Sequence, residues 1–109
     1  MISIEDFKKV DIVVGKILSV EKIPNTDKLL KLAVDLGELS PRQIVSGISL
    51  YFPDCTVLIG KKCMFVANLE PRVIRGIESQ GMILAVSGDE DKLSLLLPDT
   101  EIPVGTRAK

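Results

Sequence analysis

The sequence contains no histidine and no tryptophan, and it has only two cysteines. Without histidine, the chain cannot use histidine acid–base catalysis, a Ser-His triad or a histidine-ligated metal. Cys55 and Cys63 do not form a CxxC motif and have no partner ligands, so a zinc site is not expected. These absences predict a protein that is not an enzyme and that holds no cofactor and no metal.

Long apolar runs are also missing. No stretch approaches the roughly 18 residues of a membrane-spanning helix, and the N-terminus MISIEDFKKV lacks the apolar segment of a signal peptide. We therefore expect a cytoplasmic protein with reduced thiols and no membrane partner, although the spacing of Cys55 and Cys63 leaves a disulfide open. The 109 residues suffice for a single domain, 1–109, with one hydrophobic core.

Charge and aromatic content limit the class of partner. The net charge is −1, but between Lys28 and Arg75 seven basic residues oppose four acidic ones. This segregation is weak support for a polyanionic partner. Only three phenylalanines and one tyrosine are present, whereas proteins that bind single strands stack bases on aromatic side chains. A structured RNA held through its backbone and shape is therefore favoured over a single strand.

Alternation of apolar and polar residues predicts an all-β fold of short strands joined by turns. The predicted strands are residues 11–23, 30–36, 43–49, 63–69 and 81–86. In the first and longest of them, Gly15 suggests a bulge or a bend. The residues of that strand expected to face the core are Ile12, Val14, Leu18 and Val20.

Five short strands without a long helix favour a Greek-key barrel of the OB type. Ser3 and Asp6 predict a short N-terminal helix with a capping box, and residues 50–59, with Pro53, hold at most a short turn of helix. OB barrels bind ligands on the face of strands two and three and on the loops between strands one and two and strands four and five. The basic residues that fall on this predicted surface are Lys28, Lys31, Arg42, Arg72 and Arg75.

The stretch 64–86 carries the clearest functional signal. It reads as two apolar strands joined by a basic loop, longer than the usual 4–6 residues. Arg72 and Arg75, three apart in a non-helical loop, suit the clamping of phosphate. Asn68 and Ser79, at the ends of the loop, either hydrogen-bond its backbone or contact a ligand. Met82 belongs either to the core or to a groove edge where its thioether stacks on a base or sugar.

Six motifs occur in order along the chain, together with the ending LLLPDTEIPVGTR. They are KLLKL at 28–32, DLG at 35–37, VSGI at 45–48, NLEPR at 68–72, RG at 75–76 and SQGM at 79–82. In these motifs the sequence resembles the tRNA-binding domain found at the C-terminus of methionyl-tRNA synthetases, as a separate β subunit or as a free tRNA-binding protein. The resemblance covers essentially the whole chain.

The resemblance implies an OB fold and tRNA binding that depends on the structure of the tRNA rather than on its sequence. It also implies a homodimer that raises the tRNA affinity of a methionyl-tRNA synthetase catalytic subunit without taking part in aminoacylation. The positions that match tRNA-binding residues of the family are Lys28, Lys31, Arg42, Asn68, Arg72, Arg75, Ser79 and Met82.

A surplus apolar run, 93–97, follows the five predicted strands. An exposed apolar patch usually marks an interface, so we expect this C-terminal extension to form the dimer interface; the alternative is that it covers its own barrel. The expected interface residues are Leu93, Leu95, Leu96 and Leu97. The alternative function is that of a chaperone-like, peptide-binding homodimer, a related branch with the same fold whose motifs differ from KLLKL and VSGI.

Overall fold

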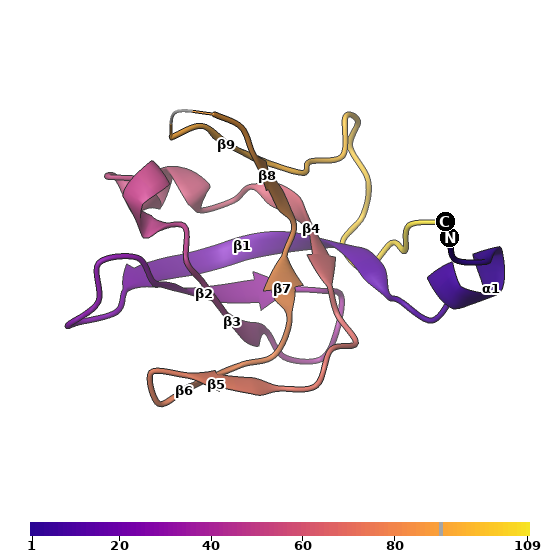
Figure 1. The fold of residues 1–109 in the computed structure, drawn as a ribbon, viewed down its shortest axis with the longest axis horizontal. Helices are drawn as coiled ribbons and strands as arrows, with labels where there is room; N and C mark the ends of the chain where they lie inside the picture. The colour runs from indigo at the N-terminus through magenta and orange to yellow at the C-terminus, as the bar shows by residue number, and fades with distance from the viewer. Residues whose placement is uncertain (90) are drawn as a thin grey trace.

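The computed structural model describes residues 1–89 and 91–109, a chain of short strands with one short α-helix near the N-terminus (Figure 1). In chain order, the elements are α1 (Ile4–Phe7), β1 (Ile12–Lys22), β2 (Leu30–Asp35), β3 (Arg42–Ser46), the 3-10 helices η1 (Ser49–Tyr51) and η2 (Cys55–Leu58), β4 (Lys62–Val66), β5 (Arg72–Ile74), β6 (Ile77–Ser79), β7 (Met82–Ile83), β8 (Ala85–Ser87) and β9 (Leu93–Leu95). The predicted all-β class is confirmed.

Five strands form one antiparallel sheet in the order β3-β2-β1-β4-β7, with the long strand β1 in its middle (Figure 1). The two outer strands approach each other through the residues just before β7. The Gln80 N–H donates to the Gln43 carbonyl at 2.8 Å, and the Gln43 N–H donates to the side-chain oxygen of Gln80 at 3.0 Å. These bonds nearly close the sheet, so the predicted five-stranded barrel is confirmed.

The barrel interior is filled by side chains from every strand of the sheet. Leu30, Leu32 and Val34 alternate inward along β2, as the period-two pattern predicts. The largest fully buried side chains are Phe65, Ile17, Leu30, Leu32, Ile44 and Leu58. Each contributes roughly 1.5–3 kcal/mol through burial of apolar surface. Because this core occupies the interior, a ligand has to bind on the outside of the barrel.

The predicted core face of β1 is only partly correct. Val14 is buried, but Leu18 is 42% exposed, and Ile17, of the opposite parity, is fully buried instead. The pairing of β1 with β2 shifts register between Ile17 and Ser19, which marks a β-bulge. Before this bulge the odd-numbered residues Val13 and Ile17 pack into the core, so Leu18 points outward. The extra residue then exchanges the two faces of the strand, and Val20 packs against the core.

Gly15 precedes this bulge and is required by a close approach. A Cβ atom at position 15 would lie 2.6 Å from Leu36 Cδ2 and 2.7 Å from Phe65 Cδ2. The bulge expected at Gly15 therefore lies two to four residues further along. At Gly15 itself, the missing side chain lets the core residues of β4 and of the β2–β3 connection pack against the backbone.

The predicted loop between the fourth and fifth strands is wrong, because residues 72–79 form the β5–β6 hairpin. The predicted fifth strand, 81–86, also differs, since it divides into β7 and β8. β7 stays in the barrel sheet, whereas β8 leaves it and pairs with β9 in a separate two-stranded sheet. In the part of the chain that the structure describes, two antiparallel strand pairs, β5–β6 and β8–β9, thus lie beyond the barrel sheet.

The expected dimer residues occupy this second sheet and the segment after it. Leu93 and Leu95, in β9, are half-buried and pack against the barrel core, which is the alternative that the sequence left open. The Leu96 N–H donates to the Leu84 carbonyl at 3.1 Å, so the following residue is also tied to the barrel. Leu96 and Leu97 remain 36% and 50% exposed.

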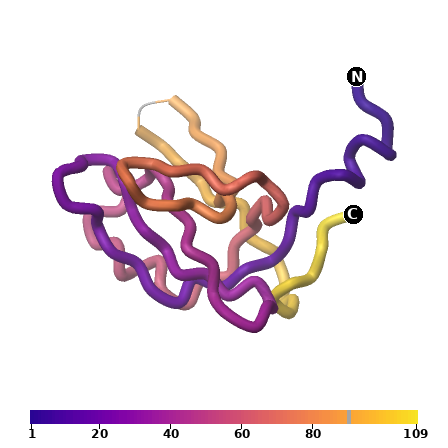
Figure 2. Tube along the Cα trace, turned by 90° about the horizontal axis from the view of Figure 1, so that it is seen from below, coloured from indigo at the N-terminus to yellow at the C-terminus, as the bar shows by residue number. Residues whose placement is uncertain are grey.

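The two chain ends lie on the same side of the barrel (Figures 1 and 2). The Val14 N–H donates to the Thr106 carbonyl at 2.9 Å, and the Ala108 N–H donates to the Ile12 carbonyl at 2.7 Å. These bonds hold the C-terminal segment, residues 103–109, against the first residues of β1. On the N-terminal side, the predicted capping box of α1 is confirmed, because Ser3 and Asp6 each accept a bond from the backbone N–H of the other.

Both cysteines are free, and Cys63 is buried in β4. Burial raises the pKa of the Cys63 thiol to about 11, so the thiol is protonated at neutral pH. Cys63 is thus a residue of the hydrophobic core. Among the helices of residues 1–89 and 91–109, none has the length and apolar character needed to cross a membrane.

Candidate nucleic-acid interface

The β5–β6 hairpin turns through two residues with left-handed backbone conformation. Arg75 has a φ angle of 53° and Gly76 one of 78°, as a two-residue type I′ turn requires. A non-glycine residue in this conformation costs roughly 1–2 kcal/mol. At this turn position Asn or Gly would be less strained than the arginine that the chain has.

The pairing register gives the hairpin two distinct faces, since paired residues of antiparallel strands point to the same side. Arg72 pairs with Ser79, and Val73 pairs with Glu78. The first pair faces the barrel, and Ser79 is buried there. The second pair is exposed to solvent on the outer face.

A groove of about 430 Å³ lies between the inner face of the hairpin and the barrel. Most of its walls are apolar, and Arg72 and Glu70 are its charged residues. The complete lining is Val45, Leu69, Glu70, Arg72, Ile74, Ser79, Gly81 and Met82. Three of the predicted site residues, Arg72, Ser79 and Met82, therefore meet at one groove, and Arg75 lies at the tip of the same hairpin.

The two hairpin arginines are available for a ligand. Both are exposed, and neither takes part in a salt bridge with any residue that the structure describes. A guanidinium carries five N–H donors in a planar fork that matches the geometry of phosphate. The hairpin thus presents two exposed guanidinium groups, without a salt bridge to a described residue, beside an apolar groove.

Ser79 has a structural role in this groove. Its hydroxyl accepts a bond from the Val45 N–H at 3.0 Å and donates to the Gly81 carbonyl at 3.0 Å. The first bond joins the end of β6 to β3 and helps to close the barrel, and the second holds the short connection from β6 to β7. Because its donor and a lone pair are already engaged, Ser79 has little hydrogen-bonding capacity left for a ligand.

Asn68 is likewise bonded to the protein backbone. Its side-chain oxygen accepts from the Asp11 N–H at 2.8 Å, and its amide group donates to the Lys9 carbonyl at 2.6 Å. Asn68 therefore ties the end of β4 to the segment that leads from α1 into β1. It does not line the groove.

Arg42 is the most heavily bonded of the predicted site residues. Its guanidinium holds the Glu38 carboxylate with two bonds, at 2.8 and 2.7 Å, and donates to the carbonyls of Ala67 and, at 3.0 Å, Gln80. The hydrogen bond from Arg42 keeps the pKa of Glu38 below its usual value. This side chain links three segments of the barrel rather than projecting toward a partner.

The remaining predicted lysines lie away from the groove. Lys31 lies on the outer face of β2 and forms a salt bridge with Glu21 at 2.8 Å, beside a small hollow of about 160 Å³ that Arg42 also lines. Lys28 is exposed in the β1–β2 connection, where its carbonyl accepts from the Ser49 N–H at 2.9 Å. The predicted site is therefore spread over several surfaces, of which the hairpin groove gathers the largest share.

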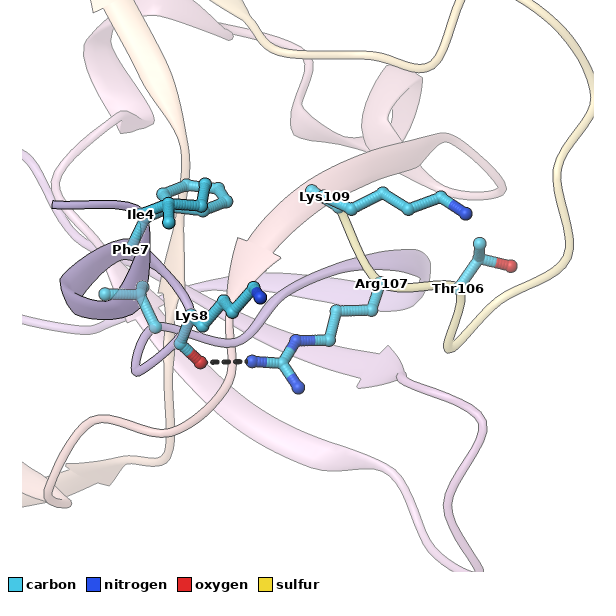
Figure 3. Close-up of a pocket in the computed structure, with 8 residues that line it drawn as sticks. Ile4, Phe7, Lys8, Thr106, Arg107 and Lys109 are labelled. Atoms are coloured by element: carbon cyan, nitrogen blue, oxygen red, sulfur yellow. Dashed lines mark hydrogen bonds between the residues drawn. The ribbon is translucent and has the colours of Figure 1, made fainter.

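A second hollow, of about 590 Å³, lies between α1 and the C-terminal segment (Figure 3). Ile4, Phe7 and Val10 give it an apolar wall. Arg107 crosses one side, where its guanidinium donates to the Lys8 carbonyl at 2.6 Å (Figure 3) and pairs with Asp11 at 2.8 Å. Sequence reasoning missed this surface, although Phe7 and Val10 share one side of the short helical pattern.

Comparison with known proteins places the chain beside translation proteins. Residues 12–107 match the family model described as "Putative tRNA binding domain". A methionine–tRNA ligase from Porphyromonas gingivalis is 45% identical over 108 residues, which is 99% of this chain and 16% of that protein. A methionine–tRNA ligase from Methanococcus aeolicus is 48% identical over 107 residues, 97% of this chain and 15% of that protein. The chain thus spans only 15–16% of the length of these relatives.

Solved structures show the same fold over the whole chain. The crystal structure of a MetRS related protein from Pyrococcus horikoshii superimposes with a TM-score of 0.90 and 39% identity, covering 100% of this chain and 98% of that one. A CsaA chaperone protein from Picrophilus torridus gives a TM-score of 0.88 and 30% identity, with 100% of both chains covered.

Proposed function

The chain belongs to the tRNA-binding domain family, and we propose that it is a tRNA-binding protein that acts without catalysis of its own. The observation that carries the proposal is the free pair of arginines on the β5–β6 hairpin. Arg72 and Arg75 are exposed, and the described residues include no acid that pairs with either. Two such groups on one hairpin suit adjacent phosphates of a nucleic-acid backbone.

Recognition in this proposal depends on the shape of the RNA. The hairpin arginines contact phosphates, and the OB-type barrel holds them at a fixed spacing, so a folded RNA that presents phosphates at that spacing binds best. Lys28 and Lys31 extend the basic surface at the edge of the same barrel. Asn68, Ser79 and Arg42 support the surface from beneath through their bonds to the backbone.

Competition binding tests this proposal. Unfractionated tRNA, polyuridine of matched length and heparin should be compared at one salt concentration, with fluorescence anisotropy as the readout. We expect folded tRNA to bind more tightly than either competitor, because only tRNA presents the required arrangement of phosphates. Binding to heparin that equals binding to tRNA would reduce the interaction to charge alone and contradict the proposal.

We place the protein in the cytoplasm as the β subunit or tRNA-binding appendage of a methionyl-tRNA synthetase. The support is the similarity of the whole chain to a small part of proteins named methionine–tRNA ligases. Purification of the tagged protein from its own cells should bring the synthetase catalytic subunit with it. If tRNA co-purifies while the synthetase is absent, the protein acts as a free tRNA-binding protein instead.

A homodimer is part of the same proposal. Leu96 and Leu97 remain exposed beside β9, and the hollow beside α1 presents Ile4 and Phe7. Burial of either apolar surface against a second copy would favour association. Sedimentation velocity at micromolar concentration should show a dimer, and Leu97→Ser and Ile4→Ser, compared with each other, identify the surface used. A monomeric wild-type protein at that concentration would contradict this part of the proposal.

The alternative function is that of a chaperone-like, peptide-binding homodimer. It is favoured by the similarity to a CsaA chaperone protein over the full length of both chains. This alternative predicts that the protein suppresses aggregation of a thermally unfolding client at stoichiometric amounts. It also predicts that tRNA neither competes with the client nor binds better than heparin does.

A further inference from the structure

The groove beneath the hairpin has a composition that phosphate binding does not explain. Its walls are mostly aliphatic side chains and one thioether, from Val45, Leu69, Ile74 and Met82. The sugar–phosphate edge of a duplex is polar and gains nothing from apolar walls. A flat, weakly polar group with a phosphate attached would instead suit both the apolar walls and the cationic edge of this groove.

Two of the groove residues are exposed at a cost that a binding role would explain. Leu69 and Met82 are 47% and 45% exposed, although both are large and apolar. Neither belongs to the buried core of the barrel. Exposed apolar side chains gathered at one hollow mark binding surfaces, and a methionine sulfur makes favourable contacts with a π-system.

Polar groups in the groove are few, and some are already satisfied. The Ser79 hydroxyl is engaged with Val45 and Gly81. The two charged side chains that line the groove are those of Arg72 and Glu70, and neither forms a salt bridge with a described residue. A guanidinium binds phosphate, and a carboxylate accepts a bond from the exocyclic amino group of a base.

We propose that the groove receives a single unpaired nucleobase of the bound RNA, with Met82 and Leu69 against its face and Arg72 on the adjoining phosphate. The Glu70 carboxylate favours a base with an exocyclic amino group over uracil. This inference rests on the proposed tRNA-binding function and adds that the RNA has to offer a base outside its helical stack.

An apolar peptide side chain is the other occupant that such walls could accept. Peptides that bind to sheet proteins commonly add a strand to an open edge. The β3 edge next to the groove is already bonded, because the Val45 N–H donates to Ser79 and the Gln43 N–H donates to Gln80. With this edge occupied and an unpaired arginine lining the groove, a base with its phosphate fits better than a peptide.

Two RNA duplexes that share one strand labelled with 2-aminopurine test the inference: the complementary strand leaves this base bulged in one duplex and pairs it with uracil in the other. We expect the bulged RNA to bind roughly 5- to 100-fold more tightly at the same salt concentration, the range for one base taken up by a side-chain surface. The fluorescence of 2-aminopurine should rise on binding, because the base leaves its stack for aliphatic walls that do not quench it.

Variants connect this preference to the groove. Met82→Ala and Leu69→Ala should each reduce the preference for the bulged RNA, measured as the ratio of the dissociation constants of the paired and the bulged RNA. Val73→Ala is the matched control, because Val73 is an exposed apolar residue on the outer face of the same hairpin. Thermal unfolding of each variant should give a melting temperature close to that of the wild type, because the replaced side chains are exposed.

Equal affinity for the two RNAs, without a change in fluorescence, would overturn the nucleobase inference. If binding then still depended steeply on salt and on Arg72, the proposed tRNA-binding function would stand. If neither RNA nor unfractionated tRNA bound, and a fluorescent apolar peptide bound in a Met82-dependent way, the inference and the proposed function would both fail.

Discussion

The cations on the β2–β3 face of the barrel are held by acidic neighbours, whereas those on the β5–β6 hairpin are not. Lys31 pairs with Glu21 at 2.8 Å, and Arg42 pairs with Glu38 at 2.7 Å. Arg72 and Arg75 have no salt bridge with a described residue. A paired cation has to loosen its existing contact before it binds a phosphate. The freedom of the basic residues to accept a new partner therefore indicates an RNA-binding surface better than the number of basic residues does.

The largest expected effect is on RNA affinity, from removal of both hairpin arginines. Arg72→Ala with Arg75→Ala should weaken tRNA binding by about 2–4 kcal/mol, which is roughly 30- to 1,000-fold, because two charge-assisted contacts are lost. The free energy of unfolding should change little, since both side chains are exposed. Anisotropy titrations and urea unfolding measure the two quantities. An unfolded double variant would show that the arginines are structural instead.

Arg42 should behave in the opposite way. Arg42→Ala should lower the free energy of unfolding by roughly 2–3 kcal/mol, because the carbonyls of Ala67 and Gln80 lose their donor. The affinity for tRNA of the protein that remains folded should fall by less than in the hairpin double variant. Urea unfolding checks the first expectation, and titration well below the melting temperature checks the second. A stable Arg42→Ala protein that does not bind tRNA would place Arg42 at the interface.

A smaller effect on tRNA affinity should follow when one paired cation loses its acidic partner. Glu21→Gln removes the partner of Lys31 and should raise tRNA affinity by about 0.5 kcal/mol, roughly twofold, as expected for an exposed ion pair. Ser19→Ala, on the same face, is the control for altered shape. Unchanged affinity in Glu21→Gln would mean that the RNA does not reach the β2–β3 face.

The smallest expected effect is on the free energy of unfolding, and it comes from Glu38, the acid that pairs with Arg42. The pKa of Glu38 is below its usual value of 4.5 because of the hydrogen bond from Arg42. A lowered folded-state pKa stabilises the protein above the usual value, and this contribution is lost as the pH falls through the lowered value. Glu38→Gln should thus cost up to about 0.5 kcal/mol at neutral pH, and this cost should shrink as the pH falls below 4.5. A difference that persists at low pH would indicate a packing role for Glu38.

The barrel strands could be predicted from the sequence because their alternation follows directly from burial. Leu30, Leu32 and Val34 point inward as expected. A strict period of two places Leu18 in the core together with Val20, because it cannot detect the bulge that follows Ile17. A bulge is set by the pairing of two strands that are distant in sequence, so the residues of β1 alone do not reveal it.

The hairpin was not predicted because its turn lacks the usual signal. Hairpin turns of this type are marked by Asn-Gly or Asp-Gly, and here the pair is Arg75-Gly76. The flanking strands have only three residues each, and Arg72 and Glu78 interrupt their apolar pattern. Arg72 and Glu78, which break the alternation that would predict the hairpin, also give the hairpin its exposed charge.

The site residues divide into those that face a ligand and those that support the fold, and sequence alone could not separate them. Asn68, Ser79 and Arg42 are polar residues at loop ends, where both roles are common. Only the positions of their partners, up to 59 residues away in the case of Asn68, show that they bond backbone groups. Arg72 has no such partner among the described residues, and this sets it apart.

The salt dependence of tRNA binding tests the central claim most directly. Dissociation constants for unfractionated tRNA should be measured from low to physiological salt for the wild type and for Arg72→Ala with Arg75→Ala. The account predicts a steep linear fall of log affinity with log salt in the wild type, with a slope about two units smaller in the variant, because each phosphate contact contributes about one unit. A flat wild-type response, or an identical slope in the variant, would contradict it.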